Sequence, residues 1–220
     1  MKEEFIEWIF FDIGGVLLDD AEAENRRIDL LHDISIKYSP SLTRDDVIAV
    51  IPEASGKIGS LNTNIIELLL KNEADKNNAL LDIKSRWKEI GYSEHRFIRP
   101  DAKIVLSELS KNYKLGMMAN QPQDVKMKLE EAGLLQYFTH SNVSDDYGFH
   151  KPDPGLFKAV FKDTKANPKR SAMIDDNAER GLLPAKKFGM YTVWYRTGEE
   201  SEKKSVDAII NSLDDLLKIF

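Results

Sequence analysis

Apolar positions follow two different patterns along the chain. Residues 6–13 are mostly apolar and end at Gly14-Gly15, which predicts a buried strand followed by a tight loop. From residue 100 onward, short apolar runs alternate with stretches whose apolar residues recur every three or four positions. The predicted strands are Lys114–Ala119, Phe138–Val143, Ser171–Ile174, Tyr191–Tyr195 and Ala208–Ile210, and the predicted helices are Asp101–Asn112, Gln123–Ala132, Pro154–Asp163, Ala178–Phe188 and Leu213–Ile219. This alternation predicts an α/β fold with a Rossmann-like parallel sheet and helices on both of its faces.

Helical periodicity also dominates the segment that follows the first strand. The segment has few strand-like runs, and proline and glycine residues separate its helices. The predicted helices are Ala21–Tyr38, Arg44–Ile51, Asn64–Lys71 and Asn77–Ile90, and the separating residues are Pro40, Pro52, Gly56 and Gly59. We therefore expect residues 20–95 to form an all-α domain inserted into an α/β core made of residues 1–19 and 96–220.

Composition narrows the classes of function. The 220 residues include 31 Lys and Arg against 37 Asp and Glu, a formal net charge of −6. An acidic balance argues against nucleic-acid binding and against a polybasic membrane anchor. No window approaches the roughly 18 apolar residues of a membrane span. Cysteine is absent, which excludes disulfides, a thiol nucleophile and zinc–thiolate or iron–sulfur sites, and fits the expected cytoplasmic location.

Polar residues follow the predicted strands, at the points where a parallel sheet binds ligands. Asp12 follows the first strand, Ala119 and Asn120 end the second, Asp175 and Asp176 follow the fourth, and Lys151 precedes the helix that begins at Pro154. Carboxylates bind hard cations such as Mg²⁺, and a carboxylate is also able to attack phosphorus. A lysine offsets the negative charge of the nucleophile and of a phosphate. We therefore expect these side chains to meet at one edge of the sheet.

Three stretches, in this order, resemble the haloacid dehalogenase superfamily. They are Phe11–Leu17, Ser144–Pro154 and Ile174–Met190. The resemblance covers about residues 7–19 and 100–220, and this family often places a helical cap where residues 20–95 stand. The segment Asp12–Val16 is similar to a subset of the family with an Asp-x-Gly-x-Val pattern.

The resemblance implies covalent phosphate chemistry on a small phosphorylated metabolite. Asp12 would be the nucleophile, and Lys151 would pair with Asp12 and with the phosphoryl group. Ala119 and Asn120 stand at the turn that binds the phosphate in the family. No nucleic-acid or membrane partner is expected, and the chain would act as a monomer or a homodimer.

The resemblance also implies a Mg²⁺ site. Asp12 and the backbone carbonyl of Gly14 would be ligands, and Asp175 and Asp176 would supply the remaining ligand and its support. Counting back from Pro184-Ala185 favours Asp176 as the direct ligand and Asp175 as its support, with a register defined to one residue.

Two positions depart from the usual pattern of the family. Gly14 stands where many of its phosphatases carry a second aspartate as general acid and base, and Ala119 replaces a Ser or Thr that binds phosphate. Three functions therefore stay open. They are a Mg²⁺-dependent phosphatase, which we favour, a 2-haloacid dehalogenase-type hydrolase, and a weak or inactive homologue that binds a phosphorylated ligand.

Other polar residues have structural explanations. Asp153 is expected to cap the helix that begins at Pro154. The pair Asp175-Asp176 is expected to cap the helix near Ala178 as well as to face a metal, and Asp145-Asp146 to cap a loop. The arginines of the insertion are expected to form a solvated face; they are Arg26, Arg27, Arg86 and Arg96.

Overall fold

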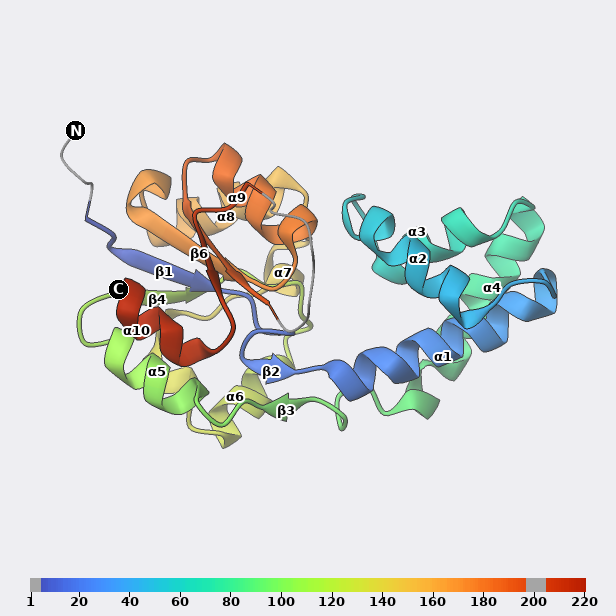
Figure 1. The fold of residues 1–220 in the computed structure, drawn as a ribbon, viewed down its shortest axis with the longest axis horizontal. Coiled ribbons are helices and arrows are strands. Elements are labelled where there is room, and N and C mark those ends of the chain that lie inside the picture. The colour runs from blue at the N-terminus through green and yellow to red at the C-terminus, as the bar shows by residue number, and fades with distance from the viewer. Residues whose placement is uncertain (1–4, 197–204) are drawn as a thin grey trace. The chain divides into compact units, whose positions relative to one another are not determined.

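The structure, a computed structural model, describes residues 5–196 and 205–220. Its contacts divide the chain into two compact units (Figure 1). One unit is Met1–Asp19 together with Ile98–Phe220, and the other is Asp20–Phe97. Two short strands that the sequence pattern did not predict, β2 (Leu18–Asp19) and β3 (Phe97–Ile98), stand where the chain passes from one unit to the other.

A six-stranded parallel sheet forms the centre of the first unit in the described residues. Its order is β5-β4-β1-β6-β7-β8, and each adjacent pair is parallel. The strands are β1 (Trp8–Phe11), β4 (Lys114–Met117), β5 (Phe138–His140), β6 (Ser171–Asp175), β7 (Tyr191–Tyr195) and β8 (Ala208–Ile210). This sheet confirms the predicted α/β, Rossmann-like class.

Alternate residues of β1 enter two separate cores, one on each face of the sheet. Ile9 and Phe11 belong to the core that α5 (Ala102–Leu109), α6 (Val125–Glu131) and α10 (Leu216–Ile219) cover. Trp8 and Phe10 belong to the other core, which α8 (Pro154–Thr164), η4 (Ala178–Leu182) and α9 (Leu183–Lys187) cover (Figure 1). All four residues of β1 are buried because it is a central strand with helices on both sides.

Helix ends follow the expected signals in some places and differ in others. Asp153 caps α8 as predicted, since its Oδ1 accepts a hydrogen bond from the Gly155 N–H at 2.7 Å. The helix predicted to start at Ala178 instead begins with the π-helical turn η4 and continues as α9. Pro184 lies in the first turn of α9, and because proline has no N–H it cannot donate a regular helical hydrogen bond. The remaining short helices of this unit are η2 (Leu135–Tyr137), α7 (Ser144–Tyr147), η3 (Pro168–Arg170) and η5 (Leu213–Asp215).

The second unit is all-α, with its own core. Its helices are α1 (Ala21–Tyr38), α2 (Arg44–Ser55), α3 (Leu61–Leu69), α4 (Glu73–Arg86) and the 3₁₀ turn η1 (Trp87–Ile90). The prediction that Pro52 ends a helix is wrong, because α2 continues to Ser55. The proline removes one hydrogen bond, to the carbonyl of Ile48, and the helix nevertheless continues for one more turn, with Ile48 on its exposed side.

The expectation of a solvated arginine face is wrong for two of the four arginines. Arg27 and Arg96 are each only 5% exposed. Arg27 pairs with Glu24, and Arg96 donates to Asp20 Oδ1 at 2.9 Å and lies over the Tyr92 ring. The neighbouring carboxylates explain the burial, since a buried charge is stable only when it is paired.

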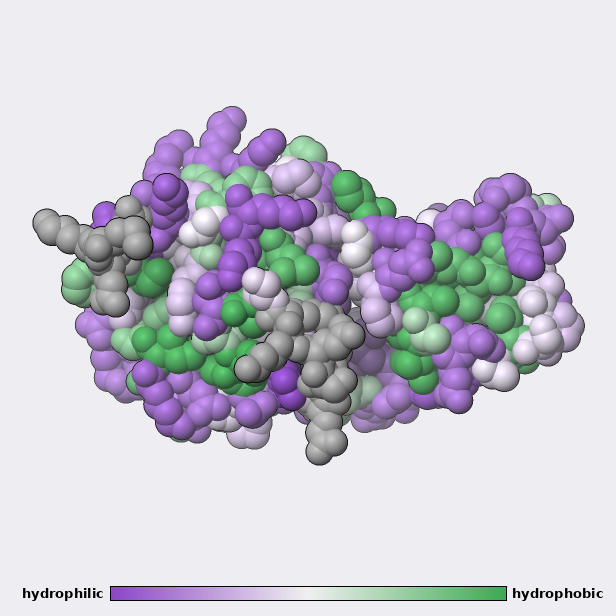
Figure 2. All heavy atoms as spheres, turned by 45° about the horizontal axis from the view of Figure 1, so that its top comes forward, coloured by the Kyte–Doolittle hydropathy of each residue, from purple (hydrophilic) through white to green (hydrophobic). Residues whose placement is uncertain are grey.

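Hydrophilic residues make up most of the face drawn in Figure 2, and hydrophobic residues form smaller separate areas on it. None of the helices in residues 5–196 and 205–220 is long and apolar enough to span a bilayer.

Gly116 provides a test of the packing around β1. It pairs with Phe10 across the sheet, and a Cβ atom at position 116 would lie 2.5 Å from the Phe10 ring. That ring is fully buried and stacks on Trp8. We expect Gly116→Ala to lower the free energy of unfolding by about 1–3 kcal/mol in a denaturant titration, because the ring has to move. Combining it with Phe10→Leu should give less than the sum of the two single effects; additive effects would contradict this packing account.

Candidate active site

Asp12 follows β1 directly, and the sheet holds its backbone in place. Its N–H donates to the Ile174 carbonyl at 2.9 Å, and on the other side the Phe11 carbonyl accepts from the Met118 N–H at 2.9 Å. The Oδ1 atom of Asp12 accepts from the Ile13 N–H at 2.7 Å. The residue is buried, so its carboxylate has a fixed position at the carboxyl edge of the sheet.

Lys151 brings the carboxylates of two strands together. Its side chain is fully buried, and its Nζ lies 2.6 Å from Asp175 Oδ2 and 3.0 Å from Asp12 Oδ2. Burial by itself lowers the pKa of Lys151, but the charges of Asp12 and Asp175 outweigh it and raise the pKa above its usual value. The lysine therefore carries a positive charge at neutral pH.

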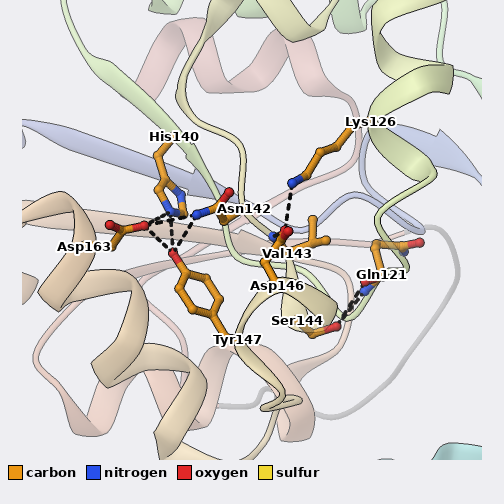
Figure 3. A network of polar contacts seen from close by, with 9 residues as sticks. All are labelled: Gln121, Lys126, His140, Asn142, Val143, Ser144, Asp146, Tyr147 and Asp163. Carbon is orange, nitrogen blue, oxygen red and sulfur yellow. Dashed lines mark hydrogen bonds and ion pairs between the residues drawn. The ribbon is translucent and has the colours of Figure 1, made fainter.

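The loop after β4 holds the segment that carries Lys151. The amide of Asn120 bonds the backbone of Lys151 twice: Oδ1 accepts from its N–H at 2.6 Å, and Nδ2 donates to its carbonyl at 2.9 Å. The Ser144 N–H donates to the Ala119 carbonyl at 3.0 Å, and Ser144 Oγ accepts from the Gln121 N–H at 3.0 Å (Figure 3). The two positions expected to bind phosphate thus lie in this loop, with the Ala119 methyl buried and the Asn120 amide engaged with Lys151.

Asp175, the last residue of β6, is fully buried, and each of its oxygens accepts a hydrogen bond. Its Oδ2 accepts from Lys151, and its Oδ1 accepts from the Asn177 N–H at 2.8 Å. A Cβ atom at Gly181 would lie 1.9 Å from Asp175 Oδ2, so only glycine leaves room for this carboxylate. Burial raises the pKa of Asp175, although the charge of Lys151 opposes the rise.

Asp176 differs from its neighbour because one of its oxygens is unused. Its Oδ1 is buried and has no hydrogen-bond partner among the described residues. Its other oxygen lies against Gly15, where a Cβ atom would be 2.0 Å from Oδ2. Gly15 has a φ of +71°, a conformation that glycine adopts without strain. The Asp176 carbonyl accepts from Trp194 Nε1 at 2.9 Å, which fixes the backbone here.

The three carboxylates suit a hard divalent cation. One ligand atom each from Asp12, Asp175 and Asp176 lies within 4.8 Å of the others. Burial and the charges of Asp175 and Asp12 raise the pKa of Asp176 well above its usual value. A cation such as Mg²⁺ would give the unused Asp176 Oδ1 a partner. It would also balance the negative charge of the three carboxylates that the single charge of Lys151 leaves over. Gly14, the expected carbonyl ligand, lies in the loop that starts at Asp12.

A second polar network fixes α7, the helix that precedes the Lys151 segment (Figure 3). Tyr147 Oη donates to Asp163 Oδ2 at 2.7 Å and lies 2.7 Å from His140 Nε2. Burial lowers the pKa of His140, although Asp163 opposes this. Asp146 accepts from Lys126 Nζ at 2.8 Å and caps the helix, in agreement with the capping role expected for the Asp145-Asp146 pair.

Three residues that shape the site escaped the sequence analysis. Asn177, rather than the Asp175-Asp176 pair, is the N-cap of η4, with its Oδ1 accepting from the Arg180 N–H at 2.9 Å. An asparagine three residues before a helical N–H is a capping signal that the sequence does carry. No sequence signal identifies Ser144 and Gly181, because their partners come from other strands or loops.

Comparison with known proteins identifies the family. A family profile described as haloacid dehalogenase-like hydrolase matches residues 6–189. The chain belongs to the haloacid dehalogenase-like hydrolases. It is 26% identical to the glyceraldehyde 3-phosphate phosphatase of Pyrococcus furiosus over 229 aligned positions, which cover 97% of this chain and 92% of that protein. It is 28% identical to the phosphoserine phosphatase of Thermus thermophilus over 123 positions, which cover 55% of this chain and 49% of that protein.

Solved structures agree with the fold of this hydrolase. A haloacid dehalogenase-like family protein from Streptococcus pneumoniae has a TM-score of 0.73 at 18% identity, over 98% of each chain. The hydrolase YfnB from Bacillus subtilis, described as bound to magnesium, has a TM-score of 0.69 at 22% identity, also over 98% of each chain.

The crowding of carboxylates in this hydrolase has a consequence for its stability without metal. Folding raises the pKa of the Asp176 carboxyl well above its ordinary value of 3.8, so the folded protein binds this proton more tightly than the unfolded chain does. The free energy of unfolding therefore falls as the pH rises from 3.8 through the pKa of the folded state. At pH 7 the folded, metal-free protein must either ionise Asp176 beside Asp175 and Asp12 or hold a proton that the unfolded chain releases, so Asp176 opposes folding in both cases. We expect Asp176→Asn to raise the melting temperature at pH 7 in EDTA, by about 2–4 °C per kcal/mol of repulsion relieved.

The matched control for that substitution is Asp145→Asn, at an exposed position, which should change stability by less than about 0.5 kcal/mol. The gain from Asp176→Asn should shrink as the pH falls toward 4. A lower melting temperature for Asp176→Asn at pH 7 in EDTA would contradict the electrostatic account.

Proposed function

We propose that this hydrolase is a Mg²⁺-dependent phosphatase that hydrolyses a small phosphorylated metabolite through an aspartyl-phosphate intermediate. The observation that carries the proposal is the position of Lys151 Nζ between the carboxylates of Asp12 and Asp175, which form one cluster with Asp176 and its unused oxygen. Relatives named as phosphatases support the same chemistry, and one of them aligns over nearly the whole chain.

Asp12 is the proposed nucleophile. One of its oxygens attacks phosphorus, the bond from phosphorus to the leaving oxygen breaks, and the leaving group takes a proton. Water then hydrolyses the aspartyl-phosphate, which releases inorganic phosphate and restores Asp12. Lys151 offsets the negative charge of the Asp12 carboxylate and of the phosphoryl group. The backbone N–H groups of Ala119 and Asn120 are the proposed donors to the phosphate oxygens, since neither side chain is available for that role.

Asp12, Asp176 and the Gly14 carbonyl are the proposed ligands of the cation. Bound Mg²⁺ supplies positive charge that polarises the phosphoryl group. Asp175 is the proposed support, because both of its oxygens already accept hydrogen bonds from Lys151 and Asn177. The helical unit Asp20–Phe97 is the proposed cap that selects the substrate.

The first test measures phosphate release from a panel of small phosphate esters, including glyceraldehyde 3-phosphate and phosphoserine. We expect turnover with Mg²⁺ and none in excess EDTA. Asp12→Asn should lower kcat to background, because an amide is a poor nucleophile, while Asp145→Asn should leave it unchanged. Full activity of Asp12→Asn would exclude covalent catalysis at this residue. Halide release from a 2-haloacid without metal would favour the dehalogenase alternative.

The second test concerns the general acid that the family usually carries at position 14. A positioned acid is worth about 10²–10⁴ in rate, and a good leaving group needs it less. We therefore expect Gly14→Asp to raise kcat on glycerol phosphate more than on p-nitrophenyl phosphate. The left-handed backbone of this loop is at Gly15 and not at Gly14, so a side chain at position 14 meets no φ strain.

The second candidate function is binding of a phosphorylated ligand without turnover, which Gly14 and Ala119 favour. Phosphate release by the wild-type protein decides between the two functions. That candidate predicts that the wild-type protein is protected against heat by inorganic phosphate with Mg²⁺ but releases no phosphate from any ester. A folded Gly14→Asp protein that gains nothing on any alkyl phosphate would mean either that the acid comes from another residue or that the protein does not turn over phosphate esters. Phosphate release by the wild-type protein separates these two outcomes.

A further inference from the structure

Arg99 connects three parts of the first unit near the candidate active site. It follows β3, and its backbone N–H donates to the Leu17 carbonyl at 3.0 Å. Its guanidinium Nη2 donates to the Gly15 carbonyl at 3.1 Å, and its Nη1 lies 3.6 Å from Asp19 Oδ2. The Cζ atom lies 4.8 Å from the centre of the Tyr195 ring, at the carboxyl end of β7.

These contacts hold the guanidinium in one place. The Arg99 side chain is only 14% exposed, and Tyr195 is buried. A guanidinium is planar and rigid, so it stacks on a ring and donates in its own plane at the same time. The Gly15 carbonyl is therefore bonded to a group that is itself fixed on β7, a central part of the sheet.

The loop that Arg99 reaches contains two adjacent glycines and must lie close to Asp176. Gly14 and Gly15 are adjacent, and glycine has the greatest backbone freedom of any residue. The loop nevertheless has to lie close to Asp176, whose Oδ2 occupies the space where Gly15 would carry a Cβ atom. Inside the loop, the Ile13 carbonyl accepts from the N–H groups of Leu17 and Leu18, and Gly14 forms an isolated β-bridge with Leu18. Arg99 adds a bond at the Gly15 carbonyl, on the side of the loop that contacts Asp176.

We infer that Arg99 is a positioning residue of the cation site. By fixing the Gly15 peptide, its guanidinium sets the distance of the Gly14 carbonyl from Asp176 and from Asp12, which the sheet holds in place, and thereby the affinity for a divalent cation. The inference rests on the proposed function, because it assigns Asp12, Gly14 and Asp176 to the cation. Neither the acidic cluster nor the sequence pattern around Asp12 requires an arginine at position 99.

The test compares Mg²⁺ binding by calorimetry in wild-type protein, Arg99→Gln and Arg99→Lys, with melting temperatures recorded for each. Partners that orient metal ligands are worth about 10–100-fold in metal affinity. We expect the Kd for Mg²⁺ to rise about 10-fold or more in Arg99→Gln. The rise should be smaller in Arg99→Lys, since an ammonium keeps the charge but cannot both stack on Tyr195 and donate in the plane.

The matched control is Arg170→Gln. Arg170 also bonds a backbone carbonyl, that of Phe5 at 3.3 Å, and a carboxylate, that of Glu7 at 2.8 Å, but it lies at the opposite end of the strands. We expect its loss to leave the Kd for Mg²⁺ unchanged. The half-saturating Mg²⁺ concentration in phosphate release should follow the calorimetric Kd in all variants.

Two results would overturn the inference. If Arg99→Gln binds Mg²⁺ within twofold of wild type while its melting temperature falls, Arg99 stabilises the fold only. If Arg99→Gln does not fold, Arg99→Lys decides by the same criterion. If wild-type protein itself binds no Mg²⁺, the proposed function fails together with the inference, whereas wild-type binding with unchanged Arg99 variants leaves the proposed function intact.

Discussion

The buried ammonium of Lys151 is the interaction on which the rest of the site depends. Two carboxylates from different strands, those of Asp12 and Asp175, contact it in a place without solvent. A buried charge is tolerated only when partners surround it, and removing one partner leaves the other uncompensated. The Asn120 amide holds the lysine backbone and the Asn177 N–H holds Asp175, so each member of the charged cluster has a neutral support.

Glycines give these charges the space they occupy. Asp175 fills the position of a Gly181 side chain, and Asp176 fills that of Gly15. At these two positions the backbone lies closer to the carboxylates than a residue with a side chain would allow. Backbone N–H groups and carbonyls therefore lie near the site. The loop after β1 is held both by its own bridge between Gly14 and Leu18 and by the bond of Arg99 to the Gly15 carbonyl.

The site is arranged for binding at a cost in stability. Three carboxylates share one edge of the sheet with a single lysine, and burial raises the pKa values of Asp175 and Asp176. Clustered charges with shifted pKa values are typical of functional sites. A bound ligand of opposite charge relieves the repulsion among the carboxylates and so stabilises the folded protein. In this hydrolase the arrangement is consistent with a divalent cation and a phosphorylated substrate binding at the same edge.

The sequence by itself determined the α/β class, most helices and strands, and the set of polar residues at the carboxyl ends of the strands. Periodicity reports which face of an element is buried, and the order of motifs identified the family. Only the tertiary structure decided that Asn120 holds Lys151 and that Arg27 and Arg96 are buried. It also decided that both oxygens of Asp175 accept hydrogen bonds while Asp176 keeps an oxygen without a partner. The physical reason is that these outcomes depend on partners from elements far apart in the sequence, whereas hydrophobic patterns describe only the local neighbourhood of each residue.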